Sequence, residues 1–157
     1  MHLKAAKRLS KEQLLIIGGV AARLLGSPTI TRDLDLCYAR DEANLERLAS
    51  ALQELGADLR GTPPGLPFRL DARTLAKGDA FTFTTDLGPL DLLAIPGGTT
   101  GFEQLEANAL TFELDGLTVR SASIDDLMLM KRAAGRAKDR IELEILSAIA
   151  DSDGAAG

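Results

Sequence analysis

The sequence predicts a mixed α/β domain (class α+β) in which helices cover a mixed, mainly antiparallel sheet. Short apolar runs alternate along the chain with longer amphipathic stretches of helical period, so strands and helices belong to one fold. Two pairs of predicted strands are joined by tight turns, DLG at residues 86–88 and DG at residues 115–116, and such hairpins pair antiparallel. The 157 residues are enough for one domain with a single core.

The first predicted elements are a strand, a glycine turn and a helix in direct succession. The apolar run in residues 13–17 predicts the strand, Gly18 and Gly19 form the turn, and residues 20–25 predict a short helix. A short helix over residues 3–9 precedes them. Because the first backbone N–H groups of a helix have no partner within it, this turn can hold an anion. Taken singly, the two glycines suit a purely conformational role better.

The second strand and the elements after it complete the predicted layout. Residues 29–38, TITRDLDLCY, predict the strand, residues 41–55 an amphipathic helix that stops at Gly56, and residues 60–70 a surface loop. The remaining predicted elements are strands 80–85 and 89–95, a loop over 97–101, a short helix to about 107, strands 110–114 and 117–121, and helices over 123–134 and 137–150. The apolar residues of the last helix are predicted to face the core: Ile141, Ile145, Leu146 and Ile149.

Composition narrows the classes of protein that the chain can belong to. A hydrophobic content of 45% and a charged content of 26% are ordinary for a soluble globular domain. The net charge of −5 argues against a protein that coats nucleic acid without specificity. The single cysteine, Cys37, excludes an internal disulfide, and no apolar run is long enough to span a bilayer, so we expect a cytoplasmic protein.

Asp33 and Asp35 are separated by one leucine in the predicted second strand. Alternate side chains of a strand share a face, so the two carboxylates are expected to point the same way. Two carboxylates on one face repel each other unless a cation lies between them, and Mg²⁺ is commonly held by one or two carboxylates. Charges on an exposed edge strand are an equally good explanation of the pair alone.

Two further charged features follow later in the chain. Asp91 lies in the apolar run PLDLLAI, where an ionised carboxylate needs a metal ion, a cationic partner or an exposed position. The segment 131–140, KRAAGRAKDR, carries Lys131, Arg136 and Lys138 around a predicted helix break. These cations suit a phosphate clamp, although a charge run by itself is more often a solvated surface.

The order of these features is that of one catalytic site: a glycine turn, an Asp-x-Asp pair on the next strand, a third carboxylate on a later strand and a basic helix. In this order the sequence resembles the nucleotidyltransferases of the DNA polymerase β superfamily. It is most similar to the small bacterial AbiEii/MenT-like group associated with toxin–antitoxin systems. The stretches that carry the resemblance are IIGGVAARLLG, TRDLDL, GPLDLLAIPGG and SIDDLMLMKRAAGRAKD, within residues 16–139.

By that resemblance, the three aspartates are the catalytic and metal-binding residues. Asp33 and Asp35 would bind Mg²⁺ (or Mn²⁺) that bridges the triphosphate of an NTP. Asp91 would bind a second metal ion or act as base on the hydroxyl of the acceptor. The implied reaction is transfer of NMP from an NTP to a hydroxyl group with release of pyrophosphate.

The resemblance also implies nucleotide-binding residues and a fold. Gly18 and Gly19 would cradle the phosphates, and Lys131, Arg136 and Lys138 would neutralise phosphate charge. Gly19 stands where the superfamily often has serine, so only backbone donors are available at that position. The implied architecture is one nucleotidyltransferase domain over 1–157, with the catalytic sheet and helices in 1–122, a small C-terminal helical extension in 123–150 and a frayed tail in 151–157.

The acceptor of the nucleotide stays open at this point. By similarity to the toxin group, the acceptor would be the 3′ end of tRNA and a cognate antitoxin would be a partner protein. Four arginines are compatible with a basic rim for tRNA: Arg60, Arg69, Arg73 and Arg132. The alternatives are adenylylation of a small molecule such as an antibiotic, adenylylation of a partner protein, and a non-catalytic nucleotide-binding protein of the same fold. The intact trio of aspartates argues against the last of these.

Overall fold

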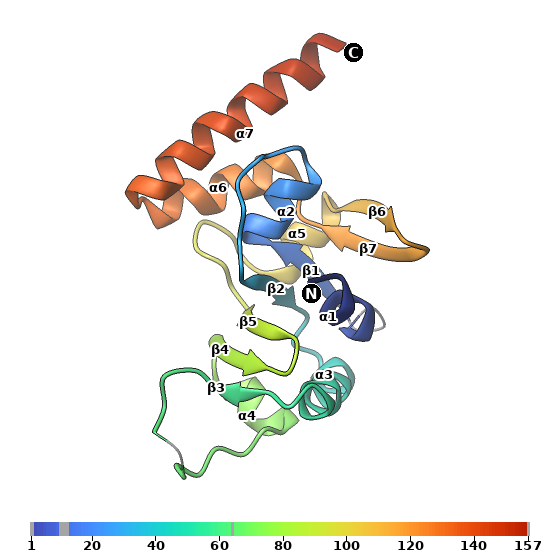
Figure 1. Ribbon diagram of the computed structural model, residues 1–157, viewed down its shortest axis with the longest axis vertical. Helices are drawn as coiled ribbons and strands as arrows, with labels where there is room; N and C mark the ends of the chain where they lie inside the picture. Colours follow the sequence, from blue (N-terminus) through green and yellow to red (C-terminus); the bar gives the residue numbers. More distant parts are fainter. Residues whose placement is uncertain (1, 10–12, 64, 157) are drawn as a thin grey trace.

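The computed structural model describes residues 2–9, 13–63 and 65–156, which form one seven-stranded sheet with helices packed around it (Figure 1). The helices are α1 (His2–Leu9), α2 (Gly18–Leu24), α3 (Glu42–Glu54), α4 (Ala72–Lys77), α5 (Phe102–Ala107), α6 (Ile124–Ala134) and α7 (Ala137–Ala156). The strands are β1 (Leu14–Ile17), β2 (Leu34–Tyr38), β3 (Asp58–Leu59), β4 (Ala80–Thr85), β5 (Gly88–Leu93), β6 (Leu110–Leu114) and β7 (Leu117–Ser121).

The order of the strands in the sheet is β3-β4-β5-β2-β1-β7-β6. Strand β2 pairs parallel with β5 and β1 pairs parallel with β7, whereas the other four pairings are antiparallel. The predicted fold class, a mixed and mainly antiparallel sheet with helices, is therefore confirmed. Figure 1 shows β2 and β1 in the middle of the molecule, with α3 and α4 at the β3 end and α6 and α7 at the opposite end.

Side-chain caps fix where three of the helices begin. Asp41, Asp71 and Ser123 each accept a hydrogen bond from the backbone N–H three residues later, at the starts of α3, α4 and α6. A cap of this kind stabilises a helix by about 0.5–2 kcal/mol. The cap at Ser123 confirms the predicted start of α6, and the helix α4, which the sequence pattern did not predict, begins at Asp71 for the same reason.

The strand that contains the aspartate pair is shorter than predicted. Residues 29–33 lie outside β2, which begins at Leu34, so Asp33 is not on the strand and does not alternate with Asp35 as predicted. The physical reason is that this segment has partners other than a neighbouring strand. The Oγ1 of Thr29 donates to Glu142 in α7, and Thr31 packs closely against Gly19 in α2.

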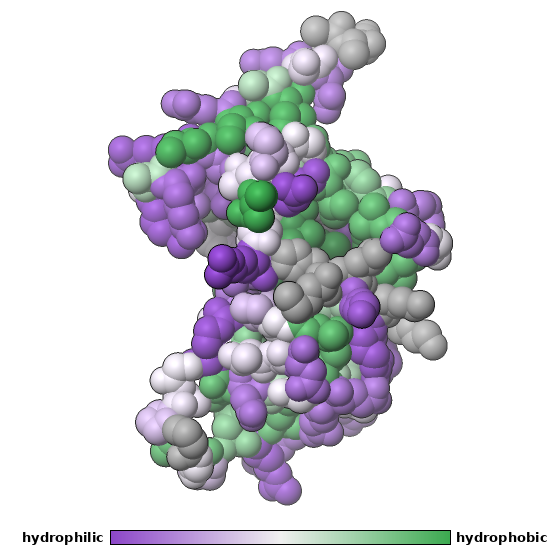
Figure 2. Space-filling view, viewed as in Figure 1, coloured by the Kyte–Doolittle hydropathy of each residue, from purple (hydrophilic) through white to green (hydrophobic). Residues whose placement is uncertain are grey.

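The last helix differs from its prediction in length and in orientation. Residues 151–156, predicted to be a frayed tail, continue α7, while residue 157 lies outside the described residues. Leu146 is fully buried as predicted, but Ile141 is 62% exposed. Figure 2 shows hydrophobic surface along part of α7. None of the described helices has the length and apolar character needed to cross a membrane.

Leu146→Ala and Ile141→Ala are expected to differ in their effect on stability, because Leu146 is buried and Ile141 is exposed. Truncation of the buried Leu146 should lower the free energy of unfolding by about 2–5 kcal/mol, because it leaves a cavity in the core. The same truncation at the exposed Ile141 should change it by no more than about 0.5 kcal/mol. Urea unfolding measures both values, and equal losses for the two variants would contradict the orientation described for α7.

Candidate functional site

The centre of the candidate site is the pairing of β2 with β5. The register of these parallel strands sets Asp35 directly beside Asp91. Side chains of directly paired residues lie on the same face of a sheet, so the two carboxylates are neighbours. The flanking residues Leu34 and Leu36 are buried, and both aspartates are half-buried. The structure thus brings together the second and third of the predicted catalytic carboxylates.

Burial and neighbouring negative charge both act on Asp35. Burial is the larger cause and the charges of Asp91 and Asp33 add to it, so the pKa of the Asp35 carboxyl is raised to about 7. The positive charge of Lys131 acts in the opposite direction. Two neighbouring carboxylates of this kind form a site that a cation can occupy.

Asp33 is the least well placed of the three aspartates. It lies just before β2, close enough to act electrostatically on Asp35, but not on the strand face. Among the described residues, no group of three or more His, Cys, Asp and Glu side chains is arranged so that it could hold a metal ion. Two adjacent carboxylates nevertheless fit the chemistry of Mg²⁺, which is usually held by one or two carboxylates together with substrate phosphates.

The glycine turn lies against this carboxylate pair. Gly18 has a φ of +66° and begins α2, and a Cβ atom at this position would overlap Oδ2 of Asp35. A Cβ at Gly19 would lie 2.8 Å from the Cβ of Thr31. Glycine at these two positions is therefore required by contact, with Asp35 in one case and with the 29–33 segment in the other. The phosphate-cradling role of both glycines stays a prediction.

A cavity of about 260 Å³ opens between the start of α2, the residues after β5 and the α6–α7 turn. Gly18, Lys131 and Arg136 all line it, so three of the predicted nucleotide-binding residues share one cavity. Most of the rest of the lining is apolar, including Leu93, Pro96, Leu127 and Met130. Of the described residues, Lys138 is exposed and does not belong to the lining, so the structure does not bring it to the cavity with the other two cations.

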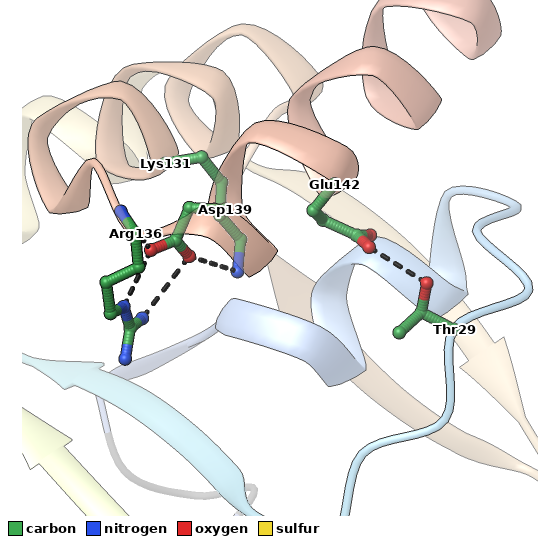
Figure 3. A network of polar contacts seen from close by, with 5 residues as sticks. All are labelled: Thr29, Lys131, Arg136, Asp139 and Glu142. Atoms are coloured by element: carbon green, nitrogen blue, oxygen red, sulfur yellow. Dashed lines mark hydrogen bonds and ion pairs between the residues drawn. The ribbon is translucent and has the colours of Figure 1, made fainter.

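Asp139 is a residue of this cavity that the sequence pattern did not single out (Figure 3). Its buried carboxylate accepts hydrogen bonds from the Arg136 backbone N–H at 3.1 Å and from Arg136 Nε at 2.6 Å. It also accepts one from Lys131 Nζ at 3.4 Å. The hydrogen bond from the Arg136 side chain is the main reason that the pKa of Asp139 is lowered. Two of the three predicted phosphate-binding cations, Lys131 and Arg136, are thus held by a carboxylate of the chain itself.

One signal in the sequence could have indicated this role. Asp139 follows Arg136 by three residues at the start of α7, the spacing at which an acidic side chain reaches back to an unpaired backbone N–H. One turn further along α7, Glu142 accepts a hydrogen bond from Thr29 at 2.9 Å (Figure 3). Glu142 is only 6% exposed. The two carboxylates therefore fix α7 to the cavity and to the segment that leads into Asp33.

Arg60 is a second residue whose position only the structure reveals. Its Nη2 donates to Oδ1 of Asp91 at 2.8 Å and to the backbone carbonyl of Phe83 at 2.7 Å. From the sequence, Arg60 was only one of several arginines compatible with an RNA-binding rim. The two residues of the ion pair are 31 positions apart, so no local pattern links them.

Comparison with known proteins rests on the fold, because no family model and no curated protein matches the sequence. The lincosamide antibiotic adenylyltransferase LnuA, solved with lincomycin bound, superposes with a TM-score of 0.59 at 14% identity over 94% of both chains. A Thermotoga maritima protein assigned to the nucleotidyltransferases gives 0.56 at 14% identity, over 90% of this chain and 87% of the other.

A third similar structure is an antigenic nucleotidyltransferase-like protein from Paracoccidioides brasiliensis. It gives a TM-score of 0.51 at 17% identity and is covered over 72% of its length, against 94% of this chain. The protein therefore has the nucleotidyltransferase fold, as the resemblance of the sequence implied. None of these proteins is described as a member of the AbiEii/MenT-like group, so that finer assignment stays a prediction.

Gly18→Ala is expected to disrupt the site more than its backbone strain alone predicts. An alanine at positive φ costs about 1–2 kcal/mol, and its Cβ must also displace the carboxylate of Asp35. Gly116 is a matched control, because it has a φ of +77° and nothing within 4 Å of an added Cβ. Chemical unfolding should show a larger loss for Gly18→Ala than for Gly116→Ala, and equal losses would contradict the contact with Asp35.

Asp139→Asn is expected to destabilise the protein at neutral pH by about 1.5–3 kcal/mol, the range for hydrogen bonds to charged groups. Because the pKa of Asp139 is lowered in the folded state, its stabilising effect is fully present above the unfolded value of about 3.9. The effect is lost as the pH falls through the lowered folded value. Unfolding curves of wild type and variant should therefore converge in acid, and a constant difference down to acidic pH would contradict this account.

Proposed function

We propose that the protein is a metal-dependent nucleotidyltransferase that transfers NMP from an NTP to a hydroxyl group and releases pyrophosphate. The observation that carries the proposal is the pairing of Asp35 with Asp91 beside Gly18, on a nucleotidyltransferase fold. A sheet interior disfavours two adjacent carboxylates unless they serve a cation or a reaction. Their position side by side in a half-buried register therefore supports a catalytic site.

Each residue of the candidate site has a proposed role in this reaction. Asp35 and Asp33 are the proposed ligands of Mg²⁺ (or Mn²⁺), and Asp91 is the proposed second-metal ligand or base. When bound, the metal ion polarises the phosphate oxygens and offsets the charge that develops on them. Gly18 and Gly19 offer the backbone at the start of α2 to the triphosphate, next to the cavity that Lys131 and Arg136 line.

The phosphate-binding role of Lys131 and Arg136 is compatible with their bonds to Asp139. Arg136 uses Nε and Nη2 for Asp139, and its side chain is 60% exposed, so its remaining donors are available to a ligand. Lys131 uses one of three donors. Lys138, which is exposed and outside the cavity, is a weaker candidate for the same role.

Three acceptors are alternatives for this reaction. The resemblance of the sequence to the toxin group favours the 3′ end of tRNA as acceptor and a cognate antitoxin as partner, in the cytoplasm. The likeness in fold to an antibiotic adenylyltransferase over 94% of both chains favours a small hydroxylated molecule as acceptor and ATP as donor. Adenylylation of a partner protein is a third possibility of the same chemistry.

Asp35→Ala is expected to abolish nucleotide transfer and to leave the fold intact. The loss should exceed the 10–100-fold that is typical when only an outer partner of a metal ligand is removed. The measurement is transfer of label from each NTP, with Mg²⁺, to total RNA, to lysate protein and to lincosamide or aminoglycoside antibiotics. Asp151→Ala, which removes an exposed carboxylate from α7, is the control and should transfer at the wild-type rate.

The fraction that takes the label identifies the acceptor. Label in RNA supports the tRNA alternative, and label in a small molecule supports the antibiotic alternative. Transfer by Asp35→Ala at the wild-type rate would contradict the site. NTP binding by wild type without transfer to any of these acceptors would favour a non-catalytic nucleotide-binding protein.

A further inference from the structure

The positive partner of Asp91 is already present in the protein. Arg60 Nη2 lies 2.8 Å from Asp91 Oδ1, and the side chains of Arg60 and Asp91 are 35% and 24% exposed. Both groups are therefore partly withdrawn from water, where an ion pair is screened less than at the surface. Arg60 thus offsets the negative charge of Asp91, as a bound cation would.

Arg60 is held in this position by more than its charge. Its backbone N–H donates to the carbonyl of Thr82 at 2.8 Å, and its Nη2 donates to the carbonyl of Phe83 at 2.7 Å. The two N–H groups of Nη2 are therefore both used, one by Phe83 and the other by Asp91. The guanidinium reaches from the end of β3 across β4 to β5, and cannot swing away without breaking these bonds.

A divalent cation on Asp91 would lie next to this fixed guanidinium. Two unit charges 4 Å apart repel by about 4 kcal/mol near a protein surface, and a divalent ion doubles the charge on one side. Asp35 has different surroundings, because the negative charges of Asp91 and Asp33 act on it more strongly than the positive charge of Lys131, which is itself bonded to Asp139. A divalent cation is therefore favoured at Asp35 and disfavoured at Asp91.

We propose that Arg60 takes the place of a second divalent cation at Asp91, so that the site holds one divalent cation, bound on the Asp35 side. This inference rests on the proposed function. Of the two roles proposed there for Asp91, second-metal ligand and base, it selects the base. Arg60 is then a positioning residue, which holds Oδ1 and leaves Oδ2 of Asp91 to act as base.

The proposed reaction step needs no second metal ion. The acceptor oxygen forms a bond to the α-phosphorus as its proton passes to Asp91. The bond between the α-phosphorus and the bridging oxygen breaks, and pyrophosphate leaves with that electron pair. Asp91 afterwards releases the proton to solvent. Arg60 stays paired with Asp91 throughout and keeps the carboxylate in place.

Binding of Mn²⁺ alone tests the inference without any turnover. Electron paramagnetic resonance or calorimetry should find one Mn²⁺ per chain in the wild type. Asp91→Asn should keep this single site, with an affinity within about threefold, whereas Asp35→Asn should lose about tenfold or more. Two Mn²⁺ ions in the wild type, or equal losses in Asp91→Asn and Asp35→Asn, would overturn the inference.

Variants of Arg60 test the other half of the inference. Arg60→Met removes the guanidinium and should admit a second Mn²⁺ at Asp91, whereas Arg60→Lys keeps a positive charge and should stay at one. Arg69→Met is the matched control, because Arg69 is 90% exposed and lies 3.7 Å from Asp71, and its Mn²⁺ binding should equal that of the wild type. A single Mn²⁺ in Arg60→Met would overturn the exclusion of a second ion.

Label transfer by the same preparations separates this inference from the proposed function. A wild type that neither binds Mn²⁺ nor transfers a nucleotide overturns both. A wild type that transfers a nucleotide, while Asp91→Asn loses Mn²⁺ as strongly as Asp35→Asn, overturns only the role of Arg60. Near-UV circular dichroism of each variant confirms that the compared proteins are folded.

Discussion

The contact on which this structure depends is the register of β2 against β5, which sets Asp35 beside Asp91 in a largely buried sheet. Two like charges about 4 Å apart repel by about 4 kcal/mol at the dielectric constant typical of a protein surface, and more where water is excluded. Burial, with the negative charges of Asp91 and Asp33 added to it, raises the pKa of Asp35 to about 7. The burial of flanking apolar residues on the same strand, such as Leu34 and Leu36, offsets this cost.

The positive charges around this pair come from distant parts of the chain. Arg60 reaches Asp91 from the end of β3, and Lys131 acts on Asp35 from α6. Lys131 in turn is bonded to Asp139 of α7, which also binds Arg136. A chain of alternating charges therefore runs from the sheet to the C-terminal helix. Through it, α7 belongs to the wall of the site and not only to the outer surface.

The segment between α2 and β2 shows how packing overrides a strand-like sequence. Residues 29–33 have the alternation of a strand, yet they form hydrogen bonds and contacts with helices. Thr29 bonds to Glu142 of α7, and Thr31 approaches Gly19 so closely that a Cβ there would lie 2.8 Å away. The same contacts explain why Gly19 is a glycine and why Asp33 lies off the strand face. The part of the site proposed to bind a cation is shaped by this segment as well as by the sheet.

The sequence by itself determined the features that depend on near neighbours. The glycine turn, the two hairpins, the cap at Ser123 and the buried strands around Asp35 and Asp91 follow from periodicity, turn chemistry and capping, which act over a few residues. The order of these motifs also indicated the nucleotidyltransferase fold. Only the tertiary structure decided which charged side chains form pairs. Arg60 and Asp91 are 31 residues apart and pair because β4 lies between β3 and β5, an arrangement that no local pattern encodes.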